Sequence, residues 1–278
     1  MGAEVVCAAI QRYISFMKQS LSGKSVSVFF LLAACCFPFG AVDAQESGGG
    51  ASPALVEYRR KIYTAYYASS MDVWKTAIDE MEAAKKKNVA YLLDLLNYQY
   101  GYIGWCIGEE RTAEAERYLA RAEENLGLLR ERAAPSSTLL AYQAALTGFR
   151  IGLSPISAPF IGPGAVEAAK ASLEADNENP FAHLQYGNVL FYMPGLFGGS
   201  REKALFHYQT AATLMERRPQ DTVENWNYLS VLVTIARAHE EMGNQAAAKR
   251  VYLKILGIEP GFLWVKEELL PALEERMR

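Results

Sequence analysis

Residues Leu229–Pro260 read LSVLVTIARAHEEMGNQAAAKRVYLKILGIEP and carry the clearest structural signal in the chain. In the first half, Leu232, Ile235 and Ala236 recur at the spacing of one face of an α-helix. Gly243 then interrupts the pattern, as a residue between two helices often does. The same spacing returns in the second half at Ala248, Tyr252 and Ile255, and Pro260 ends it. The stretch therefore predicts two antiparallel helices joined by a tight turn.

Prolines at similar places divide the rest of the chain into units of about 40 residues. These prolines are Pro135, Pro180, Pro219 and Pro260. The unit before Pro219 repeats the pattern, with Tyr186-Gly187 in one helix and Ala204, Tyr208 and Ala211 in the next. No run of alternating β-branched and polar residues suggests a strand. We therefore predict an all-α fold over residues 54–278, built from antiparallel helix pairs.

The less regular units still allow several element boundaries to be predicted. We expect a first helix pair at about 54–69 and 72–86, since the apolar spacing there is helical. The Gly/Pro-rich segment Gly152–Gly164 predicts a long loop, and Met193–Ser200 predicts a second insertion between paired helices. Residues Trp264–Met277 predict a C-terminal capping helix with charges on its outer face.

The large–small pair, the glycine and the Ala–Tyr–Pro series of Leu229–Pro260 resemble the tetratricopeptide repeat. This resemblance implies a right-handed solenoid of antiparallel helix pairs, and HEAT-type repeats are the structural alternative. Tyr102–Gly108, Met193–Ser200 and Trp264–Pro271 are similar to segments of exported bacterial tetratricopeptide proteins. A weaker similarity, to the TatT component of TRAP transporters, implies a solute-handling partner.

Residues 1–44 read as a signal peptide. Lys18 and Lys24 precede the apolar run Val26–Phe37, and Val42-Asp43-Ala44 fits a signal-peptidase site. An n-region reaching back to Met1 would be unusually long, so we expect Met17 to be the initiator. Residues 45–53 (QESGGGASP) predict a flexible linker. We expect an exported protein of a Gram-negative-type bacterium, periplasmic, envelope-bound or secreted, without a transmembrane span after signal removal.

A lipid anchor is the alternative reading of this segment, because Leu32-Ala33-Ala34-Cys35 also resembles a lipoprotein box in which Cys35 would be acylated. Removal of residues 1–44 leaves Cys106 as the single cysteine, which rules out an internal disulfide in the mature chain. Its apolar neighbours predict that Cys106 is a small buried residue.

Catalytic chemistry has little support in the sequence. His183, His207 and His239 fall on three different predicted helices, and none has a partner four residues away, so we predict no metal site. Hydrolase and redox motifs such as Gly-x-Ser-x-Gly and Cys-x-x-Cys are absent. The formal net charge of −3 does not suggest a nucleic-acid partner. We therefore predict no enzyme, no catalytic residue and no cofactor.

A binding surface is the better-supported expectation, because the repeat resemblance implies that the first helix of each unit lines a concave groove. If Gly101, Gly148, Gly187 and Ala236 contact the second helices, helical geometry turns ten other residues toward that groove. They are Tyr98, Tyr102, Trp105, Tyr142, Phe149, Phe181, Asn188, Phe191, Tyr192 and Arg237.

The alternative is that these rings only pack between units. If they do line a groove, its aromatic character predicts a peptide or protein partner. A hydrophobic small molecule is the second possibility. The polar residues available to clamp a peptide carboxylate are mainly Asn188 and Arg237. An apolar or aromatic ligand is therefore favoured over a carboxylate.

Overall fold

The computed structural model describes residues 53–133 and 136–278, and every regular element in those two ranges is helical, which confirms the all-α prediction there. The helices are α2 (Pro53–Tyr67), α3 (Met71–Ala83), α4 (Val89–Gly108), α5 (Thr112–Arg132), α6 (Ser137–Leu153), α7 (Ala158–Ala175), α8 (Pro180–Tyr192), α9 (Arg201–Glu216), α10 (Trp226–Glu241), α11 (Gln245–Ile258) and α12 (Leu270–Arg276). Short 3-10 turns cover Pro155–Ser157, Gly195–Phe197 and Pro219–Asp221, and a π-helix at Trp264–Leu269 leads into α12. The predicted signal peptide, initiator and lipoprotein box lie outside the described residues.

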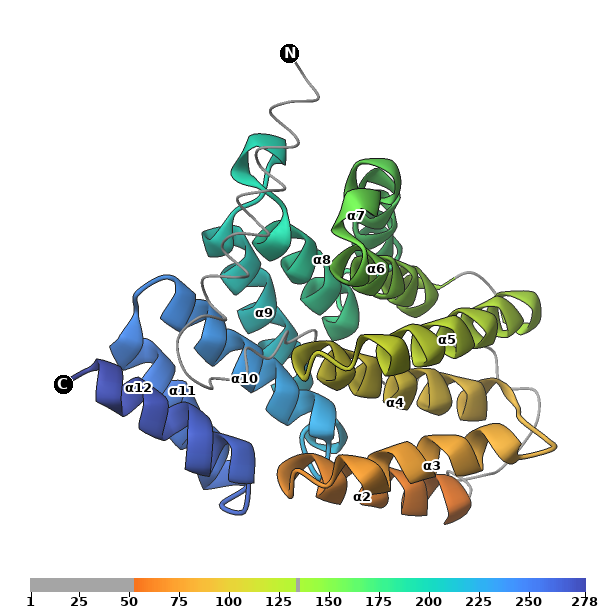
Figure 1. The fold of residues 1–278 in the computed structure, drawn as a ribbon, viewed down its shortest axis with the longest axis horizontal. Helices are drawn as coiled ribbons and strands as arrows, with labels where there is room; N and C mark the ends of the chain where they lie inside the picture. Colours follow the sequence, from red (N-terminus) through yellow and green to blue (C-terminus); the bar gives the residue numbers. More distant parts are fainter. Residues whose placement is uncertain (1–52, 134–135) are drawn as a thin grey trace.

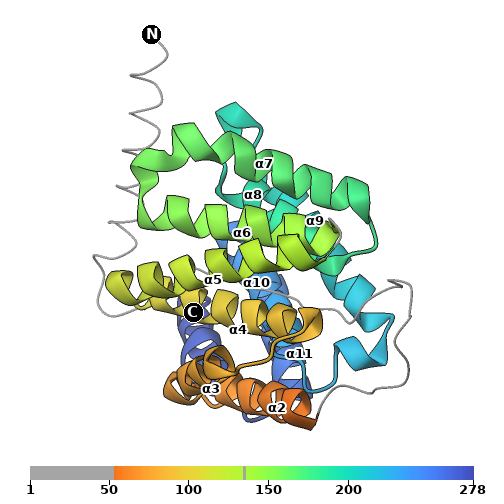
Figure 2. The same ribbon diagram turned by 90° about the vertical axis from the view of Figure 1, so that its right-hand side faces the viewer.

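Consecutive helices form pairs, as Figure 1 shows: α2 with α3, α4 with α5, α6 with α7, α8 with α9, and α10 with α11. Each helix of a pair hides one apolar stripe against its partner, and neighbouring pairs cover what remains. Figure 2 shows the same succession of pairs from the side. The predicted first pair is present at Pro53–Tyr67 and Met71–Ala83, and the predicted C-terminal helix is also present.

Polar side chains cap helices at places that the sequence indicates. Asn179 Oδ1 accepts a hydrogen bond from the backbone N–H of Phe181 at 2.9 Å, and Pro180 is the first residue of α8. Ser200 Oγ accepts one from the N–H of Lys203 at 3.2 Å, where α9 begins. These bonds satisfy backbone donors that a helix leaves unpaired at its start.

The predicted loop over Gly152–Gly164 is largely helix, and this prediction is therefore wrong. Helix α7 begins at Ala158 and runs through Pro163, although an internal proline removes a backbone hydrogen bond. Helices α6 and α7 are in extensive contact, and Ala144 of α6 and Ala168 of α7 belong to one buried cluster. Packing of these small residues outweighs the local preference for a loop.

Helices α8 and α10 lie in the interior of the molecule. In α10 every residue from Trp226 to Ala236 is buried, and in α8 the segment Pro180–Gln185 is buried as well. Such a position is expected for a helix whose apolar residues are spread around its whole circumference, because it offers no continuous polar face to water. α8 and α10, each the first helix of a predicted unit, therefore form part of the core over these segments.

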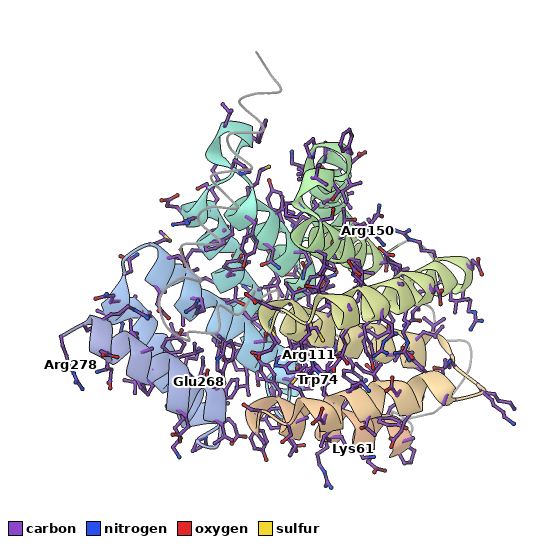
Figure 3. The ribbon with its side chains drawn as sticks, in the orientation of Figure 1. Lys61, Trp74, Arg111, Arg150, Glu268 and Arg278 are labelled. Atoms are coloured by element: carbon purple, nitrogen blue, oxygen red, sulfur yellow. The ribbon has the colours of Figure 1, made fainter. Side chains whose placement is uncertain are left out.

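The first helix pair packs against both α4 and α10, and this contact is aromatic. The ring centroids of Trp74 and Trp226 are 4.8 Å apart, and Tyr66 lies 5.6 Å from Trp226 and 5.0 Å from Phe262. We term these four residues the aromatic seam. Figure 3 labels Trp74 between α3 and α4. The seam joins segments far apart in sequence, so it stabilises the arrangement of the whole array.

Gly101 of α4 allows the aromatic seam to close. A Cβ atom at this position would lie 2.6 Å from Cζ2 of Trp74 and 2.7 Å from Cη2 of Trp226. Trp74 Nε1 donates a hydrogen bond to the carbonyl oxygen of Tyr98 at 2.9 Å, which ties α3 to α4. Trp226 Nε1 is buried and has no hydrogen-bond partner among the described residues.

Candidate binding site

Six of the ten residues predicted to line a groove are buried in the core, and none of the six is more than 4% exposed. They are Tyr98, Tyr102, Tyr142, Phe149, Phe181 and Asn188. The expectation that these side chains face an open concave surface is corrected by their burial. Their side chains pack among neighbouring helices, where a partner cannot reach them in this conformation.

The physical reason is that α4, α6 and α8 pack directly on one another. Tyr142, Phe149 and Phe181 surround Tyr100, with ring centroids 6.2, 4.8 and 5.8 Å from that of Tyr100. The hydroxyl of Tyr100 accepts a hydrogen bond from Gln185 Nε2 at 3.0 Å. The stripe that the sequence assigns to a groove is therefore used for packing between units, which was the alternative reading.

The polar atoms of the buried residues are also engaged within the protein. Tyr102 donates its hydroxyl proton to Glu114 Oε1 at 3.0 Å. Asn188 Oδ1 accepts a hydrogen bond from the hydroxyl of Tyr208 at 2.9 Å, and Asn188 Nδ2 donates to Gln185 Oε1 at 3.1 Å. Buried polar groups need such partners, so these contacts have a structural role.

The other four predicted residues, Trp105, Phe191, Tyr192 and Arg237, are partly exposed and lie on three helices. The guanidinium carbon of Arg111 lies 4.9 Å from the ring centroid of Trp105 and covers that ring. Phe191 and Tyr192 are in contact, with centroids 5.1 Å apart. The structure thus brings two of the four together, and a binding role for any of them stays a prediction.

Two histidines that the sequence places on different helices meet where α8 packs on α9. Nδ1 of His183 lies 2.9 Å from Nδ1 of His207, and Nε2 of His183 lies 2.9 Å from the carbonyl oxygen of Asn177. The helices approach closely because Gly187 has no side chain; a Cβ there would lie 2.6 Å from the ring of Tyr208. The sequence places these histidines on separate helices, and packing of the two helices brings the side chains together.

The sequence could have indicated that His183 and His207 meet, but only if the register of α8 against α9 were known. Gly187 contacts Ala204, and the two helices are antiparallel. His183 precedes Gly187 by one turn, and His207 follows Ala204 by about one turn. In an antiparallel pair, the two side chains therefore lie opposite each other. Spacing within a single helix could not show this.

The hydrogen bonds fix which ring nitrogens carry protons. A carbonyl oxygen only accepts, so His183 Nε2 must donate to Asn177, and in a neutral ring His183 Nδ1 must then accept. His207 Nδ1 is consequently the donor to His183, which leaves His207 Nε2 with a lone pair. Burial lowers the pKa of His183, and burial together with His183 lowers the pKa of His207 to about 4. Both rings are therefore neutral at neutral pH.

Aromatic side chains flank this pair at the protein surface. The ring centroids of Tyr186 and Phe206 lie 4.9 and 5.5 Å from that of His207, each edge-to-face. Phe206 is 63% exposed, and His207 is partly exposed. We term His183, Tyr186, Phe206 and His207 the histidine edge. It combines an unprotonated imidazole nitrogen with apolar rings that water can reach.

Further apolar side chains project from the turn after α6, from the start of α7 and from the turn after α8. Ile156 and Phe160 are 78% and 83% exposed, and Leu196 and Phe197 are 73% and 53% exposed. Both turns lie at the upper end of the molecule in Figures 1 and 2. Exposed apolar groups of this size are typical of surfaces that contact another molecule.

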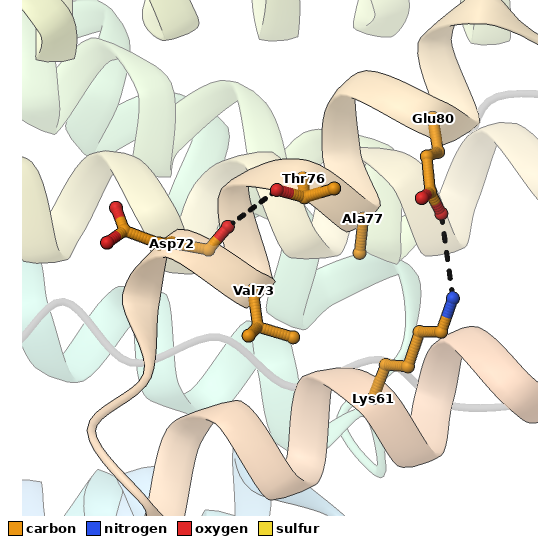
Figure 4. Close-up of a pocket in the computed structure, with 6 residues that line it drawn as sticks. All are labelled: Lys61, Asp72, Val73, Thr76, Ala77 and Glu80. Atoms are coloured by element: carbon orange, nitrogen blue, oxygen red, sulfur yellow. Dashed lines mark hydrogen bonds and ion pairs between the residues drawn. The ribbon is translucent and has the colours of Figure 1, made fainter.

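A shallow depression of about 240 Å³ lies between α2 and α3, and Figure 4 shows its lining residues. They are Lys61, Asp72, Val73, Thr76, Ala77 and Glu80. The Lys61 ammonium already pairs with Glu80 at 3.6 Å, and Thr76 Oγ1 donates to the carbonyl oxygen of Asp72 at 2.8 Å. These polar groups satisfy one another and do not converge on a ligand, so we assign no site to this depression.

Comparison with known proteins gives one informative likeness. No protein-family model matches the chain, and no curated protein matches it significantly. Among solved structures, the HusA haemophore from Porphyromonas gingivalis is similar, with a TM-score of 0.53 and 17% sequence identity. The match covers 69% of this chain and 96% of the haemophore chain. It shows that this chain shares its helical fold with a haemophore, whereas the resemblance to tetratricopeptide proteins stays a prediction.

Proposed function

We propose that this chain is an exported, non-catalytic protein that binds a flat, apolar small molecule of the haem class. The observation that carries the proposal is the histidine edge, where an exposed phenyl ring lies beside a neutral imidazole. Sites for small molecules combine apolar rings with a few well-placed polar groups, and this surface has that composition. The fold likeness to a haemophore supports the choice of ligand class.

Export is supported by the signal-peptide pattern of residues 1–44. The alternative is an exported lipoprotein that is anchored through Cys35. Within residues 53–133 and 136–278, no helix has both the length and the apolar character needed to cross a bilayer. We further propose that the helix pairs are tetratricopeptide-type repeats in a right-handed solenoid. A solute-handling role like that of TatT would be a variant of this small-molecule function.

The direct test is a titration of the purified mature protein with haemin, followed by the visible absorption of the porphyrin. We expect saturable binding at one site per chain. Phe206→Ala should weaken binding about fivefold, because it removes one aromatic contact of about 1 kcal/mol. Phe160→Ala is the matched control, since that ring is 83% exposed on a different helix and should not matter. An absence of saturable binding would refute the proposal.

A protein partner was the first expectation from the sequence. One observation supports it, namely the exposed apolar side chains at the start of α7 and in the turns after α6 and α8. The combined change Phe160→Ser and Leu196→Ser should abolish capture of such a partner and leave haemin binding unchanged. If the doubly substituted protein and the parent capture the same protein equally, this second candidate fails.

A further inference from the structure

We infer that His207 Nε2 is the axial ligand of an iron porphyrin held at the histidine edge, and that His183 is a positioning residue for it. This inference rests on the proposed function and names the contact that would select for iron. The new bond forms when the Nε2 lone pair is donated to the metal and a weakly held axial water leaves. No proton has to be released, because Nε2 carries none.

The chain of hydrogen bonds behind His207 is the arrangement that a metal-binding imidazole requires. Metal-ligating histidines usually donate their other N–H to a carbonyl, carboxylate or water, which fixes the tautomer and the ring orientation. Here His207 Nδ1 donates to His183 Nδ1 at 2.9 Å, and His183 Nε2 donates to the Asn177 carbonyl oxygen at 2.9 Å. The backbone of the turn before α8 thereby holds His207 Nε2 ready as a ligand.

The same contacts exclude a site for a simple metal ion. Three of the four ring nitrogens of His183 and His207 are used in the hydrogen bonds, so the pair presents one donor atom. Among the described residues, no group of three or more His, Cys, Asp or Glu is placed to hold a metal ion. A small cation needs several protein ligands, whereas haem iron already has four porphyrin nitrogens and is often held by one histidine.

The surroundings of His207 also suit the rest of a porphyrin. Phe206 is 63% exposed and offers its ring for apolar contact with a macrocycle. Lys203 precedes His207 by one helical turn, so the two side chains lie on neighbouring parts of one face of α9. Lys203 is exposed and makes no ion pair within the part of the chain that the structure describes. Its ammonium group is therefore available to a propionate of the porphyrin.

The experiment compares iron protoporphyrin IX with metal-free protoporphyrin IX, which has the same shape and carboxylates but cannot form the iron–nitrogen bond. Binding is measured for the parent, for His207→Ala and for His239→Ala, a matched control because His239 is a partly buried histidine on α10. We expect the parent to prefer the iron form by about tenfold or more. His207→Ala should lose this preference and retain affinity for the metal-free form, and His239→Ala should keep both.

A spectroscopic readout separates ligation from a structural effect of the substitution. The parent should show the absorption and electron paramagnetic resonance spectra of imidazole-ligated haem. His207→Gly should lose these features, and free imidazole added to that variant should restore them. His183→Ala should broaden the iron spectra, because the tautomer and orientation of His207 are no longer fixed.

The outcomes distinguish this inference from the proposed function. If neither porphyrin binds the parent, the proposed function fails and the inference fails with it. If both porphyrins bind the parent equally and His207→Ala changes nothing, the proposed function stands and the axial-ligand inference is overturned. Loss of iron preference in His239→Ala instead would also overturn it.

Discussion

The aromatic seam and the histidine edge contain similar rings in opposite surroundings. In the seam, Trp74 and Trp226 are 1% and 4% exposed, and both contact helices distant in sequence. In the edge, Phe206 is 63% exposed and contacts mainly its sequence neighbour His207. Rings of the first kind hold the fold together, and rings of the second kind stay accessible to a ligand. Aromatic content alone therefore does not locate a binding surface in this protein.

The unpaired polar atoms of the two regions differ in the same way. Trp226 Nε1 is buried and has no hydrogen-bond partner among the described residues, so its burial costs free energy. His207 Nε2 carries no proton and belongs to a partly exposed side chain, so water or a ligand can donate a hydrogen bond or bind to it. An accessible unpaired atom is a candidate for function, and a buried one is a packing compromise.

The largest expected effect comes from removing a ring of the aromatic seam. Trp226→Ala should lower the free energy of unfolding by about 3–5 kcal/mol, because it leaves a cavity where the first pair meets α10. Chemical denaturation followed by circular dichroism measures this. The folded fraction of Trp226→Ala should still bind haemin, since the seam is not part of the histidine edge.

Two further substitutions, Trp226→Phe and Phe206→Ala, test the difference between the aromatic seam and the histidine edge. Trp226→Phe should cost less than Trp226→Ala, because it keeps most of the ring and removes the unpaired donor. Phe206→Ala should change the free energy of unfolding by less than about 0.5 kcal/mol, since its ring is largely in water. Equal losses in Trp226→Ala and Phe206→Ala would contradict the division between the two regions.

A smaller effect is expected from adding a single methyl group to the seam. Gly101→Ala raises helix propensity, yet its Cβ would lie 2.6 Å from Trp74, so it should destabilise the protein by about 1–3 kcal/mol. Gly148→Ala is the matched control on α6, where no atom lies within 4 Å of the added carbon. That change should be neutral or stabilising by up to about 1 kcal/mol. If Gly101→Ala were more stable than the parent, the aromatic seam would be less tightly packed around Gly101 than the structure shows.

A further small effect is a pH dependence that originates in the histidine edge. In the unfolded chain His207 titrates near its ordinary value of 6.5, whereas in the folded chain burial and His183 lower its pKa to about 4. The unfolded state therefore binds more protons in this interval. The stabilisation is complete above pH 6.5 and is lost as the pH falls to about 4.

Three groups bear on this titration: His207 itself, His183 against it, and Asp176, whose charge favours protonation of His183. Because the ring is partly exposed, water reduces the effect to about 1 kcal/mol. Denaturation midpoints at neutral pH and at about pH 4.5 should therefore differ less in His207→Gln than in the parent. The same pH difference in both proteins would contradict a half-buried, neutral His207.

The sequence predicted the fold class and the helix pairs because both depend on local apolar spacing. The stretch Leu229–Pro260 gave two helices, α10 and α11, close to the predicted places. Cys106 is buried, as its apolar neighbours indicated. The loop predicted at Gly152–Gly164 failed because contact with α6 stabilises α7 against the preference of its glycines and proline.

The candidate site was harder to predict, because it depends on contacts between units. Tyr142, Phe149 and Phe181 were placed on a groove by helical geometry, but the spacing within one helix does not tell whether a neighbour covers that face. For the same reason, the sequence did not show that His183 and His207 meet. Their meeting depends on the close approach of α8 and α9 at Gly187.

The most direct test of the account is to locate the bound porphyrin by nuclear magnetic resonance. Paramagnetic iron porphyrin broadens the signals of nearby protons, and diamagnetic zinc porphyrin provides the reference. If the porphyrin binds at the histidine edge, the α9 amides around His207 broaden strongly and the indole N–H signal of Trp226 in the aromatic seam is unchanged. Broadening of the Trp226 signal with intact α9 signals would contradict that placement.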